Sequence, residues 1–220
     1  YELYWLGSVR GGEETAEDEC DFLRGLPREH LISTEVCPQH FTLTVPECYE
    51  KLGTLAQMNP PIRTKRHADA LWQALKDGII DCIATDHAPH TLAEKEQPYG
   101  KAPSGMPGVE TSLPLMLDRV NRNACTLQEV VFWMSESPAN LYRMQGKGRI
   151  EVGQDADLVL VDMSLKKTVT NGQLHTRVNW SPYNGMELQG WPVRTIVNGE
   201  TVFLNGEVDK RVRGREICFA

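Results

Sequence analysis

The sequence predicts an α/β fold with a buried parallel sheet, followed by a smaller β unit. Residues 79–84 form a largely apolar run, which suits a strand buried on both faces. A helix is predicted just before it, over Lys65–Lys76, because apolar residues recur there at helical spacing and Gly78 follows as a stop. After Gly148 the chain changes to short strand-like segments. We therefore predict two domains, residues 1–148 and 149–220.

The elements of the first domain follow in chain order. The acidic block Glu13–Asp21 predicts a helix that continues to Leu23, and residues 31–36 are β-prone up to Cys37-Pro38, where we expect a loop. Asn59-Pro60-Pro61 is a rigid extended turn, since each proline fixes its own φ and restricts the residue before it. Residues 88–108 are rich in proline and glycine, so a long loop is predicted there, and loops of that length are usually functional or disordered.

Three helices and a β unit are predicted in the remainder. The helices cover residues 111–121, 126–135 and 137–142; the second begins with a Thr126 and Glu129 capping box, and the third has Pro138 in its first turn. Strands are expected over 149–152 and 157–161. A hairpin is expected over 193–202, with its turn at Asn198-Gly199.

Composition favours a small-molecule substrate. The 220 residues carry a formal net charge of -7 and are 40% hydrophobic, with no apolar run near the roughly 20 residues of a membrane helix. Basic residues are scattered, which disfavours nucleic-acid binding. Six cysteines without a C-x-x-C pair indicate reduced thiols and a cytoplasmic location. The chain begins without Met, inside an apolar stretch at residues 3–6, so we expect it to be part of a longer protein.

The most informative residues stand at the end of the buried strand. Asp86 emerges there, where barrel enzymes keep their chemistry, and a carboxylate can ligate a metal or accept a proton from metal-bound water. Two imidazoles, His87 and His90, follow in the loop. The alternative is that Asp86 caps a helix and the histidines are solvated. Spacing alone leaves both interpretations open.

The segment at residues 84–91, Ala-Thr-Asp-His-Ala-Pro-His-Thr, resembles the signature of class I dihydroorotases. Four further segments fall in that family's order at similar separations: Asn59-Pro60-Pro61, Glu35–His40, Ser104–Thr111 and Asp155–Val159. The resemblance covers about residues 31–210. Hydantoinases and allantoinases share the Thr-Asp-His core but usually lack the continuation, so they are a less favoured alternative.

The resemblance implies a zinc-dependent (β/α)8 barrel with one or two ions, plus a small β-sandwich-like domain, and this chain would hold the C-terminal part of an incomplete barrel. It also implies reversible conversion of N-carbamoyl-L-aspartate and L-dihydroorotate in pyrimidine synthesis. Asp86 would be a zinc ligand and proton shuttle, Asn59 and His90 would bind the substrate, and the Ser104-Gly105 backbone would contact its ring amide. A homodimer and an association with aspartate transcarbamoylase are implied as well.

The chain departs from the family pattern in its metal ligands. The family's His-x-His-x-Arg motif is absent, residues 7–14 lack an expected histidine, and Gln39 replaces the first histidine of a Pro-His-His stretch. One carboxylate cannot hold a catalytic zinc, which needs at least three protein ligands. Cys37 with His40 is not expected to form a zinc site either, since a second such pair is missing. The chain alone is therefore expected to be inactive.

Two functions remain open for the whole protein. The first is a zinc-dependent dihydroorotase. The second is a non-catalytic, dihydroorotase-like scaffold for aspartate transcarbamoylase, which the missing histidine favours. Presence of Asp86, His90 and Asn59 together favours the enzyme, although Asn59 also suits a simple turn before proline.

Overall fold

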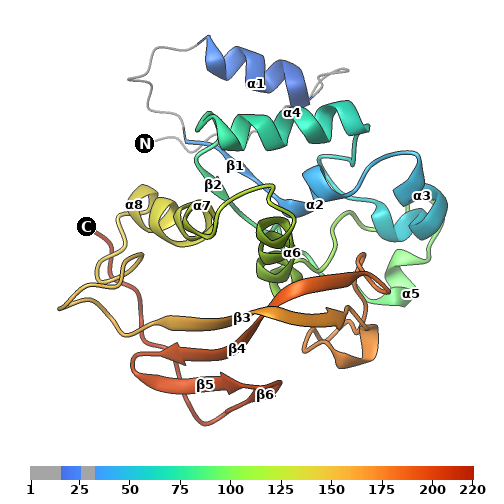
Figure 1. Ribbon diagram of the computed structural model, residues 1–220. Coiled ribbons are helices and arrows are strands. Elements are labelled where there is room, and N and C mark those ends of the chain that lie inside the picture. Colours follow the sequence, from blue (N-terminus) through green and yellow to red (C-terminus); the bar gives the residue numbers. More distant parts are fainter. Residues whose placement is uncertain (1–15, 26–32) are drawn as a thin grey trace. The chain divides into compact units, whose positions relative to one another are not determined.

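The computed structural model describes residues 16–25 and 33–220 (Figure 1). The predictions made for residues 3–6 and 7–14, and for the first part of the acidic helix, lie outside the described residues. The chain forms two compact units. One contains the residues up to Ser112 together with Val169–Gly185, and the other contains Leu113–Thr168 and Met186–Ala220.

Two short parallel strands pair side by side in the first unit (Figure 1). Strand β1 (Glu35–Val36) pairs with β2 (Cys82–Ile83), and the flanking backbone extends the ladder, since Ala84 N donates to Val36 O at 3.1 Å. Parallel pairing of the apolar run at 79–84 is confirmed, although the strand is shorter than predicted. Polar residues after Ala84 therefore leave the sheet at its carboxyl end.

Short helices and turns make up most of the remaining secondary structure of this unit. They are α1 (Ala16–Arg24), α2 (Pro38–Thr42), α3 (Glu47–Leu52), a 3-10 turn (Gly53–Ala56), α4 (Lys65–Lys76), α5 (Leu92–Lys95) and a 3-10 turn (Asn171–Gln173). Helix α4 has the predicted bounds, with Ala68 and Leu75 on its buried side. Helix α1 lies beside it (Figure 1) and confirms the described part of the predicted acidic helix.

Two predictions for the first unit are wrong in detail. The segment after Cys37 is helix α2 and not a loop, because Pro38 occupies its first turn, where no N–H donor is needed. The loop predicted over 88–108 contains helix α5, which begins with a capping box. Thr91 Oγ1 accepts from Glu94 N at 3.3 Å, and the Glu94 carboxylate accepts from Thr91 N at 2.8 Å.

The helical part of the second unit is more continuous than predicted. Helix α6 (Val109–Asn121) crosses the division between the units, and α7 (Leu127–Val131) starts with the predicted capping box. A π-helical turn (Phe132–Glu136) then leads directly into α8 (Ser137–Leu141). Pro138, the second residue of α8, has no N–H for the preceding turn, which accounts for the widening of the helix there.

An antiparallel sheet completes the second unit. Its order is β3 (Leu158–Thr168), β4 (Glu187–Val197), β5 (Glu200–Leu204) and β6 (Glu207–Val208). The predicted hairpin is confirmed, and its turn residues have the positive φ values that such a turn requires, 51° at Asn198 and 83° at Gly199. The strand predicted at 157–161 is the start of β3. The strand predicted at 149–152 is wrong, since these residues are exposed and irregular.

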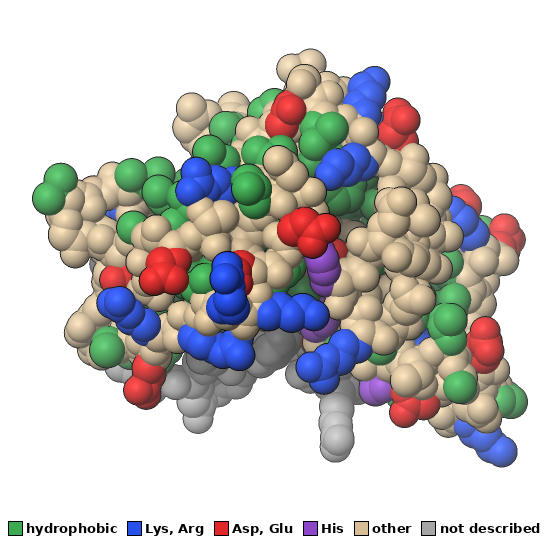
Figure 2. All heavy atoms as spheres, turned by 90° about the horizontal axis from the view of Figure 1, so that it is seen from below, with side chains coloured by type: hydrophobic (Ala, Val, Ile, Leu, Met, Phe, Trp, Pro, Cys, Tyr) green, Lys and Arg blue, Asp and Glu red, His purple; other side chains and the backbone are tan. Residues whose placement is uncertain are grey.

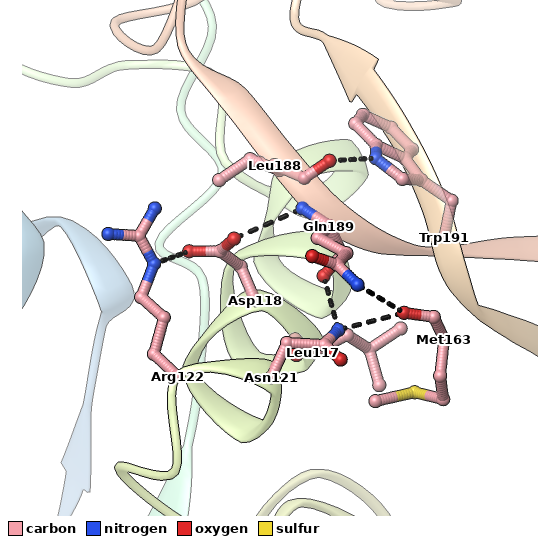
Figure 3. Close-up of polar contacts among 8 residues, drawn as sticks. All are labelled: Leu117, Asp118, Asn121, Arg122, Met163, Leu188, Gln189 and Trp191. Carbon is pink, nitrogen blue, oxygen red and sulfur yellow. Dashed lines mark hydrogen bonds and ion pairs between the residues drawn. The ribbon is translucent and has the colours of Figure 1, made fainter.

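Helix α6 is joined to the sheet by side-chain amides and carboxylates (Figure 3). Asn121 Nδ2 donates to Met163 O at 3.0 Å and to Gln189 O at 2.9 Å. Asp118 accepts from Gln189 N at 3.0 Å and from Arg122 Nε at 2.6 Å. Half-buried backbone groups of β3 and β4 therefore find partners on α6.

The last residues of the chain pair with the segment after α8. Gln145 N donates to Cys218 O at 2.8 Å, and Ala220 N donates to Arg143 O at 3.0 Å.

All six cysteines are free thiols. Among the helices within residues 16–25 and 33–220, none is long and apolar enough to cross a membrane. On the face drawn in Figure 2, basic and acidic side chains are both present. The predicted domain boundary at 148 stays a prediction.

Candidate functional site

Asp86 follows strand β2 and lies in the first unit. Its side chain is half-buried, and its backbone has a φ of 42°. This left-handed region is uncommon for residues other than glycine, although aspartate and asparagine tolerate it best. Such backbone strain persists only where the surroundings impose it, and it gathers at functional sites. The strand end therefore presents a carboxylate on a backbone of uncommon conformation.

A buried amide holds the residue before Asp86. The Gln39 side chain is 1% exposed, and its Nε2 donates to Thr85 O at 3.0 Å. Gly108 approaches the same carbonyl, since a Cβ at that position would lie 2.9 Å from Thr85 O. Only glycine fits so close a backbone approach. Gln39, where the resemblance leads one to expect histidine, thus anchors the backbone that leads to Asp86.

His87 caps the start of helix α6. Its Nδ1 accepts from Gly108 N at 3.1 Å and from Val109 N at 3.3 Å. Because both partners are donors, this nitrogen carries no proton, and the hydrogen of a neutral ring is assigned to Nε2. His87 has a structural partner on one nitrogen and is exposed to solvent.

Three groups, on β1, at the residue before α2 and on α2, lie within electrostatic range of the Asp86 carboxylate. Burial, and then the charge of Asp86, raises the pKa of Glu35 and that of the Cys37 thiol. Burial lowers the pKa of His40, against the opposing effects of the Pro60 carbonyl and Asp86. His40 Nε2 lies 3.0 Å from Pro60 O, next to Asn59 in the sequence. The neighbourhood of Asp86 is thus poorly hydrated and rich in ionisable groups.

Of the predicted substrate-binding residues, the structure joins His90 to Ser104. His90 Nε2 lies 3.1 Å from Ser104 O. Gly105 N donates to Gln57 O at 3.0 Å, which ties it to the segment that leads to the exposed Asn59. Asp86 is positioned separately from these residues, through the hydrogen bond of Gln39 to the backbone of Thr85. The Gly105 N–H is already used, so a contact from Gly105 to a ring amide would have to come from its carbonyl.

Two buried residues beside these were not singled out from the sequence. Lys95 is 0% exposed and donates from Nζ to three backbone carbonyls. Trp180 is 1% exposed, and its Nε1 donates to His90 O at 2.8 Å. The Thr91 and Glu94 capping box was the local signal for the helix that carries Lys95. Neither lysine nor tryptophan had a sequence pattern that indicated burial.

The predicted zinc was tested against the donors present. Within residues 16–25 and 33–220, no group of three or more His, Cys, Asp or Glu side chains could hold a metal ion. Catalytic zinc sites use at least three protein ligands. These residues therefore do not fit a zinc ion by themselves, and Asp86 as a zinc ligand stays a prediction.

The chain matches the amidohydrolase family over residues 10–202. A protein named dihydroorotase from Ruminiclostridium cellulolyticum is 41% identical over 201 residues, which are 90% of this chain and 46% of that protein. The dihydroorotase of Halobacterium salinarum is 40% identical over 183 residues, 83% of this chain and 43% of that protein. The chain thus spans less than half the length of these curated relatives.

Solved structures of hydantoinases share its fold. L-hydantoinase (dihydropyrimidinase) from Arthrobacter aurescens has a TM-score of 0.82 and 33% identity, covering 87% of this chain and 44% of that one. D-hydantoinase from Thermus sp. has a TM-score of 0.78 and 28% identity, covering 88% of this chain and 43% of that one. The mixed α/β fold and the resemblance to dihydroorotases are confirmed, while the incomplete barrel and the β-sandwich stay predictions. The chain belongs to the amidohydrolase family.

Proposed function

We propose that the protein containing this chain is a dihydroorotase-type hydrolase, which interconverts L-dihydroorotate and N-carbamoyl-L-aspartate. The observation that carries the proposal is Asp86, held in a left-handed conformation at the end of β2, in the same unit as His90, Ser104 and Gly105. The curated relatives named dihydroorotase support this substrate class.

Asp86 is proposed to move the proton of the reaction. In hydrolysis, water oxygen bonds to the ring amide carbon and the carbon–nitrogen bond breaks. The Asp86 carboxylate accepts a proton from that water and returns it to the departing nitrogen. General acid–base transfer of this kind contributes about 10²- to 10⁴-fold in rate. The reverse reaction uses the same carboxylate in the opposite sense.

The substrate is proposed to lie against Asn59 and the His90–Ser104 pair. His90 uses Nε2 toward Ser104 O, which leaves Nδ1 for the substrate. Asn59 is exposed and offers both an amide donor and an acceptor.

Zinc dependence, a homodimer, association with aspartate transcarbamoylase and a cytoplasmic location are part of the same proposal. They rest on the resemblance alone. Since the described residues offer one carboxylate at the strand end, no step above is assigned to a metal.

The test is turnover by the protein expressed from its complete gene, with zinc measured by atomic emission. Asp86→Asn removes the base but keeps a residue that tolerates a φ of 42°. We expect a loss of at least about 10²-fold in dihydroorotate hydrolysis, with an unchanged melting temperature. Asp69→Asn, an exposed carboxylate on α4 that pairs with Lys65, is the matched control and should keep full activity.

Three outcomes would contradict the proposal. Asp86→Asn with activity close to that of the unaltered protein would remove Asp86 from the reaction. Turnover of hydantoin in place of dihydroorotate would indicate a hydantoinase. A folded protein inert toward cyclic amides would favour the non-catalytic scaffold.

A further inference from the structure

A lysine lies fully buried beneath the predicted substrate-binding loop. Lys95 is the last residue of α5, and its side chain is 0% exposed. Its Nζ donates to Gln57 O at 2.7 Å, to Pro103 O at 2.9 Å and to Gly105 O at 2.9 Å. An ammonium has three donors and no acceptor, so every donor has one partner. We call this arrangement the Lys95 clamp.

The clamp is built without a counter-charge. Lysine is almost never fully buried unless it is paired with an acid. Yet within the part of the chain that the structure describes, Lys95 forms no ion pair, and its partners are backbone carbonyls. Burial lowers its pKa to about 8. A methionine would fill the same space without that cost, but it would leave the carbonyls of Pro103 and Gly105 without this donor and would take one of two donors from Gln57 O.

The clamp joins the two segments that carry the predicted substrate contacts. Gln57 stands two residues before Asn59, and its own Nε2 donates to Ala102 O at 2.8 Å. Gly105 N donates back to Gln57 O at 3.0 Å, so the clamp and this bond fix the same turn. The backbone at Gly105 also packs closely on Ala88, since a Cβ at Gly105 would lie 2.7 Å from the Ala88 Cβ.

Helix α5 places the clamp relative to His90. The capping box fixes the first turn of the helix directly after His90, and Lys95 N donates to Thr91 O at 3.0 Å. His90 Nε2 in turn contacts Ser104 O, the carbonyl between two clamp partners. One short helix therefore carries a substrate-binding histidine at one end and the clamp at the other.

We infer that Lys95 is a positioning residue, which holds the Ser104-Gly105 turn and the Asn59 segment in the geometry that binds substrate. A role as a nucleophile does not fit, because Nζ is inaccessible and all of its donors are engaged. The substrate part of this inference rests on the proposed function, whereas the clamp itself does not.

The experiment compares Lys95→Met with Lys101→Met in the protein expressed from its complete gene. Lys101 is an exposed lysine of the same loop and serves as the matched control. Hydrogen exchange, read by mass spectrometry on peptides covering residues 97–106, reports the loop directly. KM and kcat for L-dihydroorotate, with the folded fraction from circular dichroism, report the site.

For Lys95→Met we expect exchange at residues 97–106 to rise at least roughly tenfold, and KM to rise roughly tenfold with a smaller change in kcat, at an unchanged folded fraction. Lys101→Met should leave all of these unchanged. A loss that merely followed unfolding would lower kcat in proportion to the folded fraction and leave KM alone. That result would overturn the inference.

Two further results are decisive. If Lys95→Met does not fold, Lys95→Gln replaces it, since its amide keeps two donors and should give an intermediate rise in exchange and KM. Unchanged exchange and an unchanged KM in a folded variant would overturn the clamp. If the unaltered protein turns over no cyclic amide, the proposed function and the substrate part fail, while the exchange measurement still decides whether the clamp exists.

Discussion

Three polar side chains around the candidate site, the buried Gln39 and Lys95 and the exposed His87, bond to backbone groups and not to each other. Gln39 supplies a donor to Thr85 O, His87 supplies an acceptor to the first N–H groups of α6, and Lys95 supplies three donors. Buried backbone groups without partners cost free energy, so loops near a strand end need such side chains to hold one conformation. The three residues together stiffen the segments on either side of Asp86.

Lys95 makes the stability of the protein depend on pH in a defined window. Its ordinary pKa is 10.5, and burial lowers the value in the folded protein to about 8. Between these values the unfolded chain holds a proton that the folded chain has lost. The free energy of unfolding therefore rises with pH across this window. Below the window Lys95 is charged in the folded protein, and burying that charge lowers stability by the full amount.

We subtract the unfolding free energy of Lys95→Met from that of the unaltered protein. This difference is expected to rise by on the order of 3 kcal/mol from pH 8 to pH 10.5. Urea titrations of both proteins across this range measure it. The buried cysteines titrate in both proteins, so their contribution cancels. A difference that stays constant would mean that Lys95 keeps its ordinary pKa, and a difference that falls would mean that folding raises it.

The sequence allowed Asp86 and His90 to be identified as candidates, because the motif at 84–91 follows an apolar run. It did not reveal the roles of Gln39, His87 and Lys95. Their partners are backbone atoms far along the chain, such as Thr85 O for Gln39 and Gln57 O for Lys95. A backbone carbonyl has no sequence signature, so contacts of this kind become visible only in the fold.

At the scale of elements, local signals predicted helices well where one pattern governed the whole segment. Helix α4 has its predicted bounds because its apolar spacing and the stop at Gly78 agree. Helix α5 was missed because prolines and glycines dominate the stretch around it, although Thr91 and Glu94 form a capping box. The strands of the first unit came out short because pairing partners, and not β-propensity, set their length.

The contact between α6 and β4 gives a prediction at this scale. Gly190 has a φ of 103°, and a Cβ there would lie 2.6 Å from the Leu117 Cβ. Gly206 has a similar φ of 99°, with nothing within 4 Å. Alanine at either position strains the backbone, but only Gly190→Ala forces the strand away from the helix and from its hydrogen bonds with Asn121.

We expect Gly190→Ala to be more destabilising than Gly206→Ala by about 1–3 kcal/mol, the usual cost of overpacking. Chemical denaturation of the two variants gives this difference directly, with the backbone strain common to both. Equal destabilisation of the two variants would show that α6 and β4 can separate at little cost.

At the scale of the whole molecule, the chain divides into two compact units. The chain passes from one compact unit to the other after Ser112, after Thr168 and after Gly185, so neither unit is one continuous segment. The sequence predicts a single boundary at 148, because the chain changes there to short strand-like segments. Such a change indicates where strands begin, but it does not indicate that α6 supplies hydrogen-bond partners of β3 and β4.

A fragment of residues 149–220 is therefore expected not to fold. It lacks Asn121, which donates to Met163 O and Gln189 O, and it lacks the segment at Arg143–Gln145 that pairs with the C-terminal residues. Residues 113–220 restore both sets of contacts. Thermal melts followed by circular dichroism should show a cooperative transition for 113–220 only. A cooperative melt of 149–220 would support the predicted boundary instead.

The anchor of Asp86 has a consequence for how the whole protein responds to acidity. Gln39 holds Thr85 O through an amide, which neither gains nor loses a proton between mildly acid and alkaline solution. An imidazole in its place would gain a second N–H on acidification and could switch partners. The group that holds the backbone leading to Asp86 thus does not titrate in this range. Residue 39 therefore adds no inflection to the dependence of the reaction rate on pH.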